Sequence, residues 1–254
     1  MKAGREMFSL TFEMPPPGLK LGPDEIHIWI GLLDQPVSRL QRLAETLSGE
    51  ERIKADHFHF DKDRRYFTAR RGILRTILGS YLNADPSLLT FRYGRNRKPE
   101  LKDGFGKGRI HFNLSHSEGV SVFAFARDHE IGVDIEQVRD ISGMKQIVER
   151  FFSIRENELF RSLGENQKKE AFFKGWTCKE AFIKAIGEGL FRPLDQFDVS
   201  LFPGEPTKLL RIDGDAGEAR RWSIQELKPA PNCLGAFAVK THRYETRCWR
   251  WEGR

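Results

Sequence analysis

The chain has 254 residues, of which 39% are hydrophobic and 11% aromatic, and this length suits one large domain or two smaller ones. The composition excludes a disordered chain, and no stretch approaches the roughly 20 apolar residues that span a bilayer. A formal net charge of +6 favours an anionic partner, which can be a nucleic acid, a phosphorylated small molecule or an acidic protein.

The first half of the chain predicts helices followed by strands. Ser48 and Glu51 form a capping-box pattern at the start of one helix. A long amphipathic helix follows over residues 63–82, and its polar positions include Arg65, Arg70, Arg71 and Arg75. Strands are expected at residues 25–33, 120–126 and 131–135, and a basic, glycine-rich loop at residues 92–109.

The second half loosely repeats this order. It predicts helices at residues 144–152, 154–163 and 170–186, and strands at residues 197–201, 221–227 and 234–240. Residues 119–126 also resemble residues 234–240, and each segment closes its half. These similarities predict two lobes, residues 1–127 and 128–254, with a ligand site between them.

The cysteines and the N-terminus favour a cytoplasmic location. Residues 1–17 lack an unbroken apolar stretch and do not resemble a signal peptide. The three cysteines cannot all pair with one another and none lies in a CxxC motif, as is typical of free thiols in a reducing compartment.

The sharpest local pattern is Gly132-Val133-Asp134-Ile135-Glu136. On a strand, Asp134 and Glu136 face one side while Val133 and Ile135 enter the core. Two such close carboxylates repel each other unless a cation or a proton lies between them, and hard oxygen ligands suit Mg²⁺. Taken alone, the pattern fits equally well a strand with a solvated polar face.

Three further segments carry polar or charged groups. In residues 176–185, Glu180 and Lys184 lie four apart and share one face of a helix; alone they are read more simply as a surface pair. Residues 111–119 offer hydroxyl, amide and imidazole groups before a strand, or are turn formers. Arg97, Lys98 and Pro99 form a stiff basic loop that suits a phosphate or is an ordinary surface loop.

In this order, the four segments resemble the signature of the Sfp-type 4'-phosphopantetheinyl transferase family. That signature has a Lys-Pro loop, an SHS segment, GxDxE and WxxKEAxxK. Here the segments are Arg97-Lys98-Pro99, Ser115-His116-Ser117, Gly132-Val-Asp134-Ile-Glu136 and Trp176-Thr-Cys-Lys179-Glu180-Ala-Phe-Ile-Lys184. The resemblance covers residues 55–201, and four short motifs in the correct order make a specific match.

The resemblance implies an α+β fold of two similar subdomains related by a pseudo-twofold axis, with coenzyme A and Mg²⁺ at their junction. It implies transfer of phosphopantetheine from coenzyme A to a serine of an acidic carrier protein, with release of adenosine 3',5'-bisphosphate. The implied metal ligands are Asp134, Glu136 and Glu180. The implied catalytic residues are Glu180 or Glu136 as the base and Lys184 at the phosphoryl group, and the implied coenzyme A contacts are Arg70 or Arg71, Lys98, Pro99, Ser115, His116, Asp134 and Lys184.

Two other functions remain open on the sequence alone. A magnesium-dependent nuclease also uses Asp-x-Glu with a later Glu and Lys, but its Glu-x-Lys usually lies on a strand rather than a helix. The second is a coenzyme A-binding or carrier-binding protein without activity, against which the intact acids argue. We expect no nucleic-acid or membrane partner and, because one chain supplies both lobes, a monomer.

Overall fold

The computed structural model describes residues 11–94, 98–102 and 110–253, and it confirms the expected mixed α+β fold. Arg95 and Arg97 of the predicted basic loop lie outside the described residues. The helices are α1 (Val37–Glu45), α2 (Gly49–Asp56), α3 (Asp61–Leu82), α4 (Met144–Phe151), α5 (Ile154–Ser162), α6 (Glu165–Ile186) and α7 (Ala216–Ala219), with short 3₁₀ turns η1 (Pro86–Leu88), η2 (Gly189–Phe191) and η3 (Leu194–Gln196).

The strands form two main sheets and two short hairpins. They are β1 (Glu25–Leu32), β2 (Phe91–Tyr93), β3 (Pro99–Leu101), β4 (Ile110–Ser117), β5 (Val120–Arg127), β6 (Ile131–Gln137), β7 (Phe197–Val199), β8 (Leu209–Ile212), β9 (Ser223–Leu227), β10 (Cys233–Val239) and β11 (Glu245–Arg250). The short hairpins pair β2 with β3 and β7 with β8.

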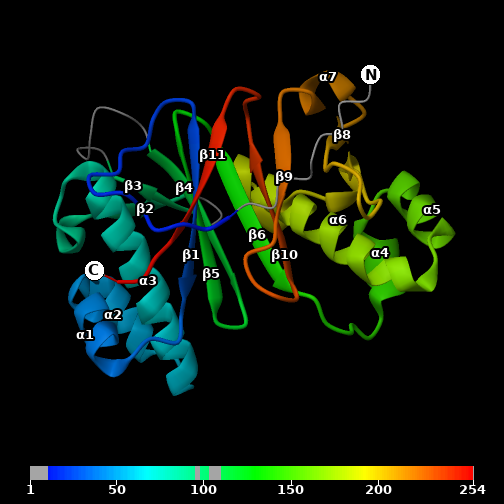
Figure 1. The fold of residues 1–254 in the computed structure, drawn as a ribbon. Coiled ribbons are helices and arrows are strands. Elements are labelled where there is room, and N and C mark those ends of the chain that lie inside the picture. The colour runs from blue at the N-terminus through cyan, green and yellow to red at the C-terminus, as the bar shows by residue number, and fades with distance from the viewer. Residues whose placement is uncertain (1–10, 95–97, 103–109, 254) are drawn as a thin grey trace.

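The first main sheet has the strand order β11-β1-β5-β4 and carries α3 (Figure 1). Its core contains apolar side chains of α3 such as Ile73 and Leu78 together with Phe123 and Phe125 of β5. Helix α3 ends because Asn83 takes a left-handed conformation, with φ of 49°, and the N–H of the next residue bonds back to the helix. The fold thus fixes the arginine-bearing face of α3 beside the sheet.

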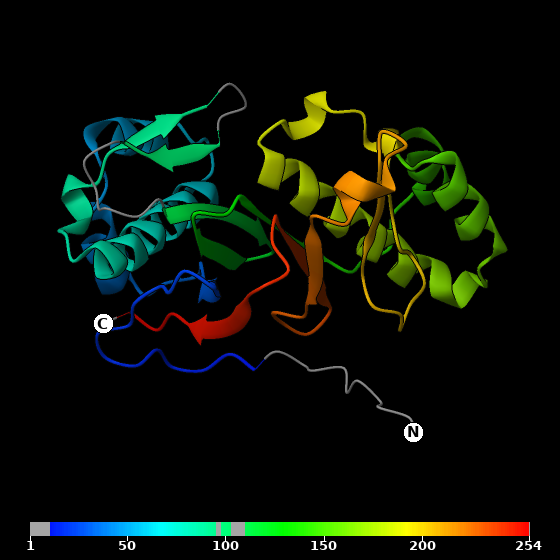
Figure 2. The same cartoon turned by 90° about the horizontal axis from the view of Figure 1, so that it is seen from above.

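The second main sheet has the order β6-β10-β9, all antiparallel, and carries α6. Gly132 makes the close packing of α6 on β6 possible, since a Cβ at this position would lie 2.1 Å from the carbonyl oxygen of Ala181. Helix α6 ends at Gly187, which has a φ of 75°. Seen from above, the helices that pack on the two main sheets lie on opposite outer sides, with the sheets between them (Figure 2).

Strands β4 and β6 meet where the two sheets adjoin, and polar side chains connect them. Asn113 Oδ1 accepts a hydrogen bond from the backbone N–H of Val133 at 2.9 Å. Ser115 Oγ donates to Asp134 at 2.9 Å, and Ser117 Oγ accepts from the N–H of Gln137 at 3.1 Å. The polar segment before the predicted strand is therefore itself a strand, β4, whose apolar residues alternate with these polar ones.

The observed elements match most of the predicted ones. The capping box at Ser48 and Glu51 is present, and α3 begins two residues before its expected start. The sequence analysis missed α1, β4, α7, β8 and β11. Of these, β11 runs parallel to β1, so the end of the chain belongs to the first sheet. The sequence analysis was also wrong to expect only a loop over residues 92–109, because the three-residue strands β2 and β3 pair with each other there. The division into lobes at residues 127 and 128 stays a prediction.

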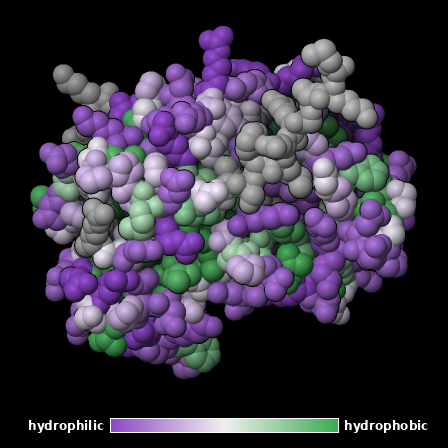
Figure 3. Space-filling model, viewed as in Figure 1, coloured by the Kyte–Doolittle hydropathy of each residue, from purple (hydrophilic) through white to green (hydrophobic). Residues whose placement is uncertain are grey.

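The outside of the molecule is mainly hydrophilic on the face shown in Figure 3, where hydrophobic side chains form only small, separate groups. Within the described ranges, none of the helices is long and apolar enough to cross a membrane. The three cysteines, Cys178, Cys233 and Cys248, are buried and unpaired.

Candidate functional site

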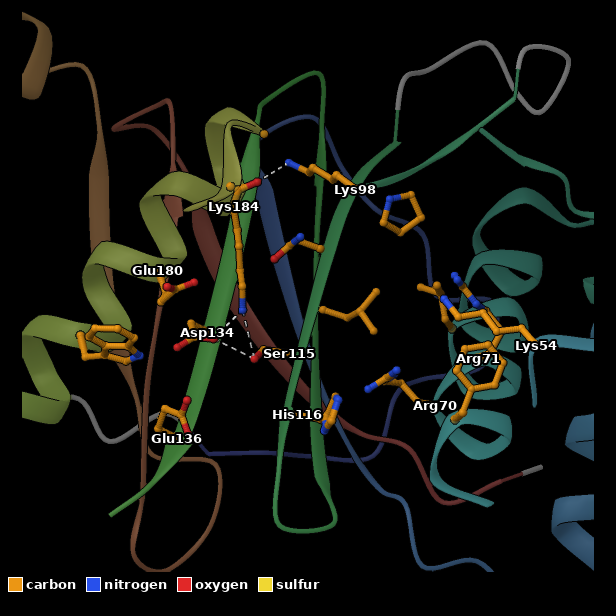
Figure 4. A pocket seen from close by; sticks show the side chains of 18 residues that line it. Lys54, Arg70, Arg71, Lys98, Ser115, His116, Asp134, Glu136, Glu180 and Lys184 are labelled. Atoms are coloured by element: carbon orange, nitrogen blue, oxygen red, sulfur yellow. Dashed lines mark hydrogen bonds and ion pairs between the residues drawn. The ribbon is translucent and has the colours of Figure 1, made fainter. Parts of the chain in front are cut away.

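A cavity of about 560 Å³ brings together residues from the two main sheets and from the helices packed on them (Figure 4). Its walls come from α2, α3, β3, β4, β6 and α6. It contains every site residue that the sequence predicted: Arg70, Arg71, Lys98, Pro99, Ser115, His116, Asp134, Glu136, Glu180 and Lys184. The structure therefore groups these residues in one place, while their individual roles stay predictions.

One wall of the pocket is acidic. Asp134 and Glu136 project from β6, and Glu180 projects from α6 (Figure 4). The predicted alternation on β6 is confirmed, because Val133 and Ile135 are buried in the core on the other face. Burial, together with the charges of Asp134 and Glu136 and against the opposing charge of Lys184, raises the pKa of Glu180 to about 7.

The pKa of Glu136 is shifted in the same direction. Burial and the charge of Asp134 raise its pKa, against smaller lowering effects that include a hydrogen bond from Ser117. In both carboxyl groups burial is the main cause of the raised pKa and a neighbouring carboxylate adds to it, so a cation bound here would favour their charged forms.

Lys184 reaches across the acidic wall. Its Nζ lies 2.5 Å from Asp134 Oδ1 and 3.3 Å from Ser115 Oγ, which itself donates to the same Oδ1. The other oxygen of Asp134, Oδ2, is buried and has no hydrogen-bond partner among the described residues. A buried carboxylate oxygen without a partner is costly, and a cation would satisfy it.

These observations test the predicted Mg²⁺ site. In the described part of the chain, no three acidic, imidazole or thiol side chains stand close enough together to form a ready metal site. The side chains nevertheless fit the ion, because Asp134, Glu136 and Glu180 offer only carboxylate oxygens, the ligands that Mg²⁺ prefers. Asp134 Oδ2 has no hydrogen-bond partner among the described residues, and the pKa values of Glu136 and Glu180 are raised.

The opposite wall is basic. Arg70 and Arg71 come from α3 and Lys54 from α2, and His116 of β4 lies near Arg70 (Figure 4). Burial and the adjacent Arg71 lower the pKa of Arg70 to about 10, so it remains charged at neutral pH. Burial, Arg70 and Lys184 lower the pKa of His116 to about 4, so its imidazole is neutral.

The two arginines are held differently. Arg71 Nε lies 3.0 Å from Glu51 Oε1, and its Nη2 donates to Tyr93 Oη at 2.9 Å. Arg70 has no carboxylate partner among the described residues and contacts the ring of Phe67. Arg71 therefore has a carboxylate partner, which it shares with Arg75, whereas Arg70 has none among the described residues and its charge is available to a ligand.

Lys98 lines the pocket, but its ammonium group is already occupied. Nζ donates to the backbone carbonyls of Ile131, Lys184 and Ala185 at 3.0, 2.8 and 3.0 Å. Pro99, the next residue, begins β3 and also lines the pocket. The sequence placed Lys98 at a phosphate, a role that nothing in these contacts requires.

Sequence reasoning missed one residue that lines the pocket and one that anchors the helix carrying site residues. Lys54 lies in the pocket only because α2 packs beside α3, and no local pattern signals this. Lys179, inside the WxxKEAxxK segment, was given no role; it is fully buried, pairs with Glu156 at 2.7 Å and donates to two backbone carbonyls. A lysine on the apolar face of α6 was the signal that could have identified it.

Comparisons with known proteins agree with this site. The family model for the 4'-phosphopantetheinyl transferase superfamily matches residues 130–241. The chain is 43% identical to 4'-phosphopantetheinyl transferase HetI of Nostoc sp. over 96% of this chain and 100% of that protein. It is 32% identical to 4'-phosphopantetheinyl transferase Sfp of Bacillus subtilis, over 66% of this chain and 74% of that protein.

Among solved structures, the chain is similar to holo-[acyl-carrier-protein] synthase of Thermotoga maritima. The TM-score is 0.35 and the identity 23%, over 45% of this chain and 64% of that one.

Proposed function

The chain belongs to the 4'-phosphopantetheinyl transferase superfamily and is a phosphopantetheinyl transferase, and on that premise we propose its substrates, metal and product. We infer that it moves 4'-phosphopantetheine from coenzyme A to a serine of an apo acyl or peptidyl carrier protein, and that it releases adenosine 3',5'-bisphosphate. The observation that carries this proposal is the single pocket in which an acidic wall faces a basic one.

The basic wall suits the nucleotide end of coenzyme A. Arg70 offers an uncompensated guanidinium, and His116 offers an imidazole next to it. An anion bound here gains charge-assisted hydrogen bonds and relieves the repulsion between Arg70 and Arg71. This wall would bind the cofactor substrate without taking part in the reaction.

The acidic wall suits the reacting phosphates. Asp134, Glu136 and Glu180 would hold Mg²⁺, which supplies positive charge to the pyrophosphate oxygens when bound. Lys184, whose ammonium already lies within this wall, would contact the transferred phosphoryl group. Phosphoryl transfer depends mainly on such positioning and charge stabilisation.

In the proposed reaction, the serine hydroxyl of the carrier attacks the β-phosphate, the one attached to pantetheine. A bond forms between the serine oxygen and phosphorus, and the bond from phosphorus to the oxygen of the leaving adenosine 3',5'-bisphosphate breaks. The serine proton passes to a base, directly or through a water. Glu180, with a pKa raised to about 7, is the first candidate for that base, and Glu136 is the second.

The carrier and the cellular setting are also proposals. A net charge of +6 supports electrostatic attraction of an acidic carrier protein. Unpaired cysteines support a reducing compartment, the cytoplasm. One chain supplies both walls of the pocket, which supports a monomer.

Mass spectrometry of an apo acyl carrier protein tests the proposal directly. The carrier is incubated with this protein, coenzyme A and Mg²⁺, with an EDTA sample beside it. We expect the carrier to gain one phosphopantetheine and expect EDTA to abolish the gain.

Two matched variants sharpen this experiment. Asp134→Asn keeps the shape of the side chain but removes its charge, so transfer should be lost. Asp34→Asn changes an exposed carboxylate outside the pocket and should transfer normally. No gain with several carriers, or a gain that persists with EDTA, would refute the substrate or the metal assignment respectively.

A further inference from the structure

Lys98 joins the first lobe to the end of α6, and we propose that it is a positioning residue for Lys184 rather than a ligand of a phosphate. The inference rests on the proposed function, since it concerns the placement of a side chain in the proposed active site. It differs from the role that the sequence suggested for this lysine.

The hydrogen bonds of Lys98 leave it no free donor. An ammonium group has three N–H donors, and those of Lys98 point to three backbone carbonyl oxygens, of Ile131, Lys184 and Ala185, all within 3.0 Å. A phosphate oxygen would have to displace one of these acceptors, so holding a ligand is not what this group does in the structure.

Two of the three acceptors lie in the last turn of α6. The final carbonyls of a helix have no partner within the helix, and they carry the negative end of its dipole. Lys98 satisfies the carbonyls of Lys184 and Ala185, shortly before the helix ends at Ile186. It therefore caps α6 with a positive charge from another part of the chain.

Lys98 is half-buried, and its ammonium group is surrounded by backbone acceptors. Burial lowers its pKa to about 8, with Glu130 and Glu100 opposing that effect. An ammonium group partly withdrawn from water requires partners that replace the lost water, and within the described residues the three carbonyls are the acceptors it has. The stem of Lys98 also passes Gly187, whose Cβ, if present, would lie 3.9 Å from Lys98 Cδ.

The consequence for the active site follows from Lys184. Its backbone carbonyl is held by Lys98, while its side chain reaches Asp134 at 2.5 Å, as Figure 4 shows. Ile131, the third acceptor, begins the strand that carries Asp134. Lys98 therefore ties together the ends of the two elements, α6 and β6, whose side chains meet in the acidic wall.

The test separates positioning from binding by comparing kcat with KM. In K98M, which keeps the length of the side chain but removes its donors, we expect kcat to fall about 10- to 100-fold, because a misplacement of about 1 Å can cost that much. The KM for coenzyme A should change less than about twofold. We expect K98R to recover part of the lost kcat, because arginine restores the positive charge but cannot reproduce the three hydrogen bonds of the lysine ammonium group.

Hydrogen exchange provides a readout that does not depend on activity. Amides of the last turn of α6 should exchange faster in K98M, and those of an R70M control should not. This holds even if the wild-type protein modifies no carrier, so failure of this inference can be told apart from failure of the proposed function.

Two results would overturn the inference. A KM or Kd for coenzyme A raised tenfold or more, with kcat unchanged, would make Lys98 a ligand of the cofactor substrate. Unchanged exchange at the end of α6 would show that Lys98 holds nothing in place. If K98M does not fold, K98Q, which retains hydrogen-bond donors, allows the same comparison.

Discussion

At the scale of single residues, neighbouring side chains of the same type have different environments. The sequence could not choose between Arg70 and Arg71 as the arginine that holds a phosphate. The structure separates them through Glu51, a buried carboxylate that is 3.0 Å from Arg71 and 2.6 Å from Arg75. Arg70 keeps an uncompensated charge beside His116, and we infer that it is the anion-binding member of the pair.

Replacing each arginine by glutamine tests this assignment. R70Q should raise the KM for coenzyme A about tenfold or more, because one charge-assisted hydrogen bond contributes about 1.5–3 kcal/mol. R71Q should instead lower the melting temperature, since it removes a cation from the buried Glu51. Steady-state kinetics and thermal unfolding of both variants distinguish the two effects.

Dephospho-coenzyme A provides the control for the first effect. If Arg70 holds the 3'-phosphate, R70Q should lose little further affinity for a substrate that lacks this group. An equal penalty with both substrates would place Arg70 elsewhere along the cofactor, and no penalty with either would remove it from the site.

At the scale of elements, helix α6 carries one lysine that anchors it in the core and two residues that enter the proposed active site. Lys179 turns into the core, where it pairs with Glu156 and donates to the carbonyls of Leu194 and Phe197 at 2.7 Å. Glu180 and Lys184, on a different face, enter the pocket. Anchoring one face of the helix in this way sets the direction of the other.

The contact between α6 and β6 depends on Gly132. An added Cβ would lie 2.1 Å from the carbonyl oxygen of Ala181 and 2.3 Å from the amide nitrogen of Ala185, and neither backbone atom can move alone. G132A should therefore push α6 outward, cost about 1–3 kcal/mol of stability, and reduce transfer at least tenfold.

Chemical denaturation and carrier-modification rates measure these two effects. Gly49→Ala is the matched control, because Gly49 is an exposed helical residue with nothing within 4 Å of an added Cβ. It should be neutral or slightly stabilising. Full activity and stability in G132A would disprove the close packing of helix on strand.

At the scale of the whole molecule, the two ends of the described chain meet in one sheet. Strand β11 lies parallel to β1, and Trp249 packs against Trp29 and His27 at the junction with α3. His27 is fully buried, with its Nδ1 2.7 Å from Tyr81 Oη and its Nε2 3.3 Å from Glu25. This cluster connects β1, α3 and β11.

The buried imidazole predicts a loss of stability in acid. Burial lowers the pKa of His27 to about 4, with Glu25 opposing, whereas an imidazole in the unfolded chain titrates near 6.5. Between these values the unfolded state binds more protons, so the free energy of unfolding falls as the pH falls. A single such group accounts for about 3 kcal/mol across this window.

Urea unfolding between pH 7 and 4 measures this dependence. H27N keeps a hydrogen-bonding side chain without a titrating ring and should flatten the curve over this range. H59N alters an exposed histidine and should follow the wild-type curve. Identical slopes in wild type and H27N would show that His27 titrates normally in the folded protein.

The sequence by itself determined the features that lie within single elements. Alternation within residues 132–136 placed Asp134 and Glu136 on one face of a strand, and the four-residue spacing of Glu180 and Lys184 placed these two on one face of a helix. These patterns follow from the repeat of a strand or a helix, which depends only on neighbouring residues. The order of the motifs was enough to indicate the family.

Only the tertiary structure decided what depends on distances between elements. It brought Lys54 into the pocket, paired Arg71 with Glu51, and filled the donors of Lys98 with carbonyls from β6 and α6. It also returned β11 to the first sheet. No local pattern encodes these contacts, because they arise from the packing of segments that are far apart in the chain.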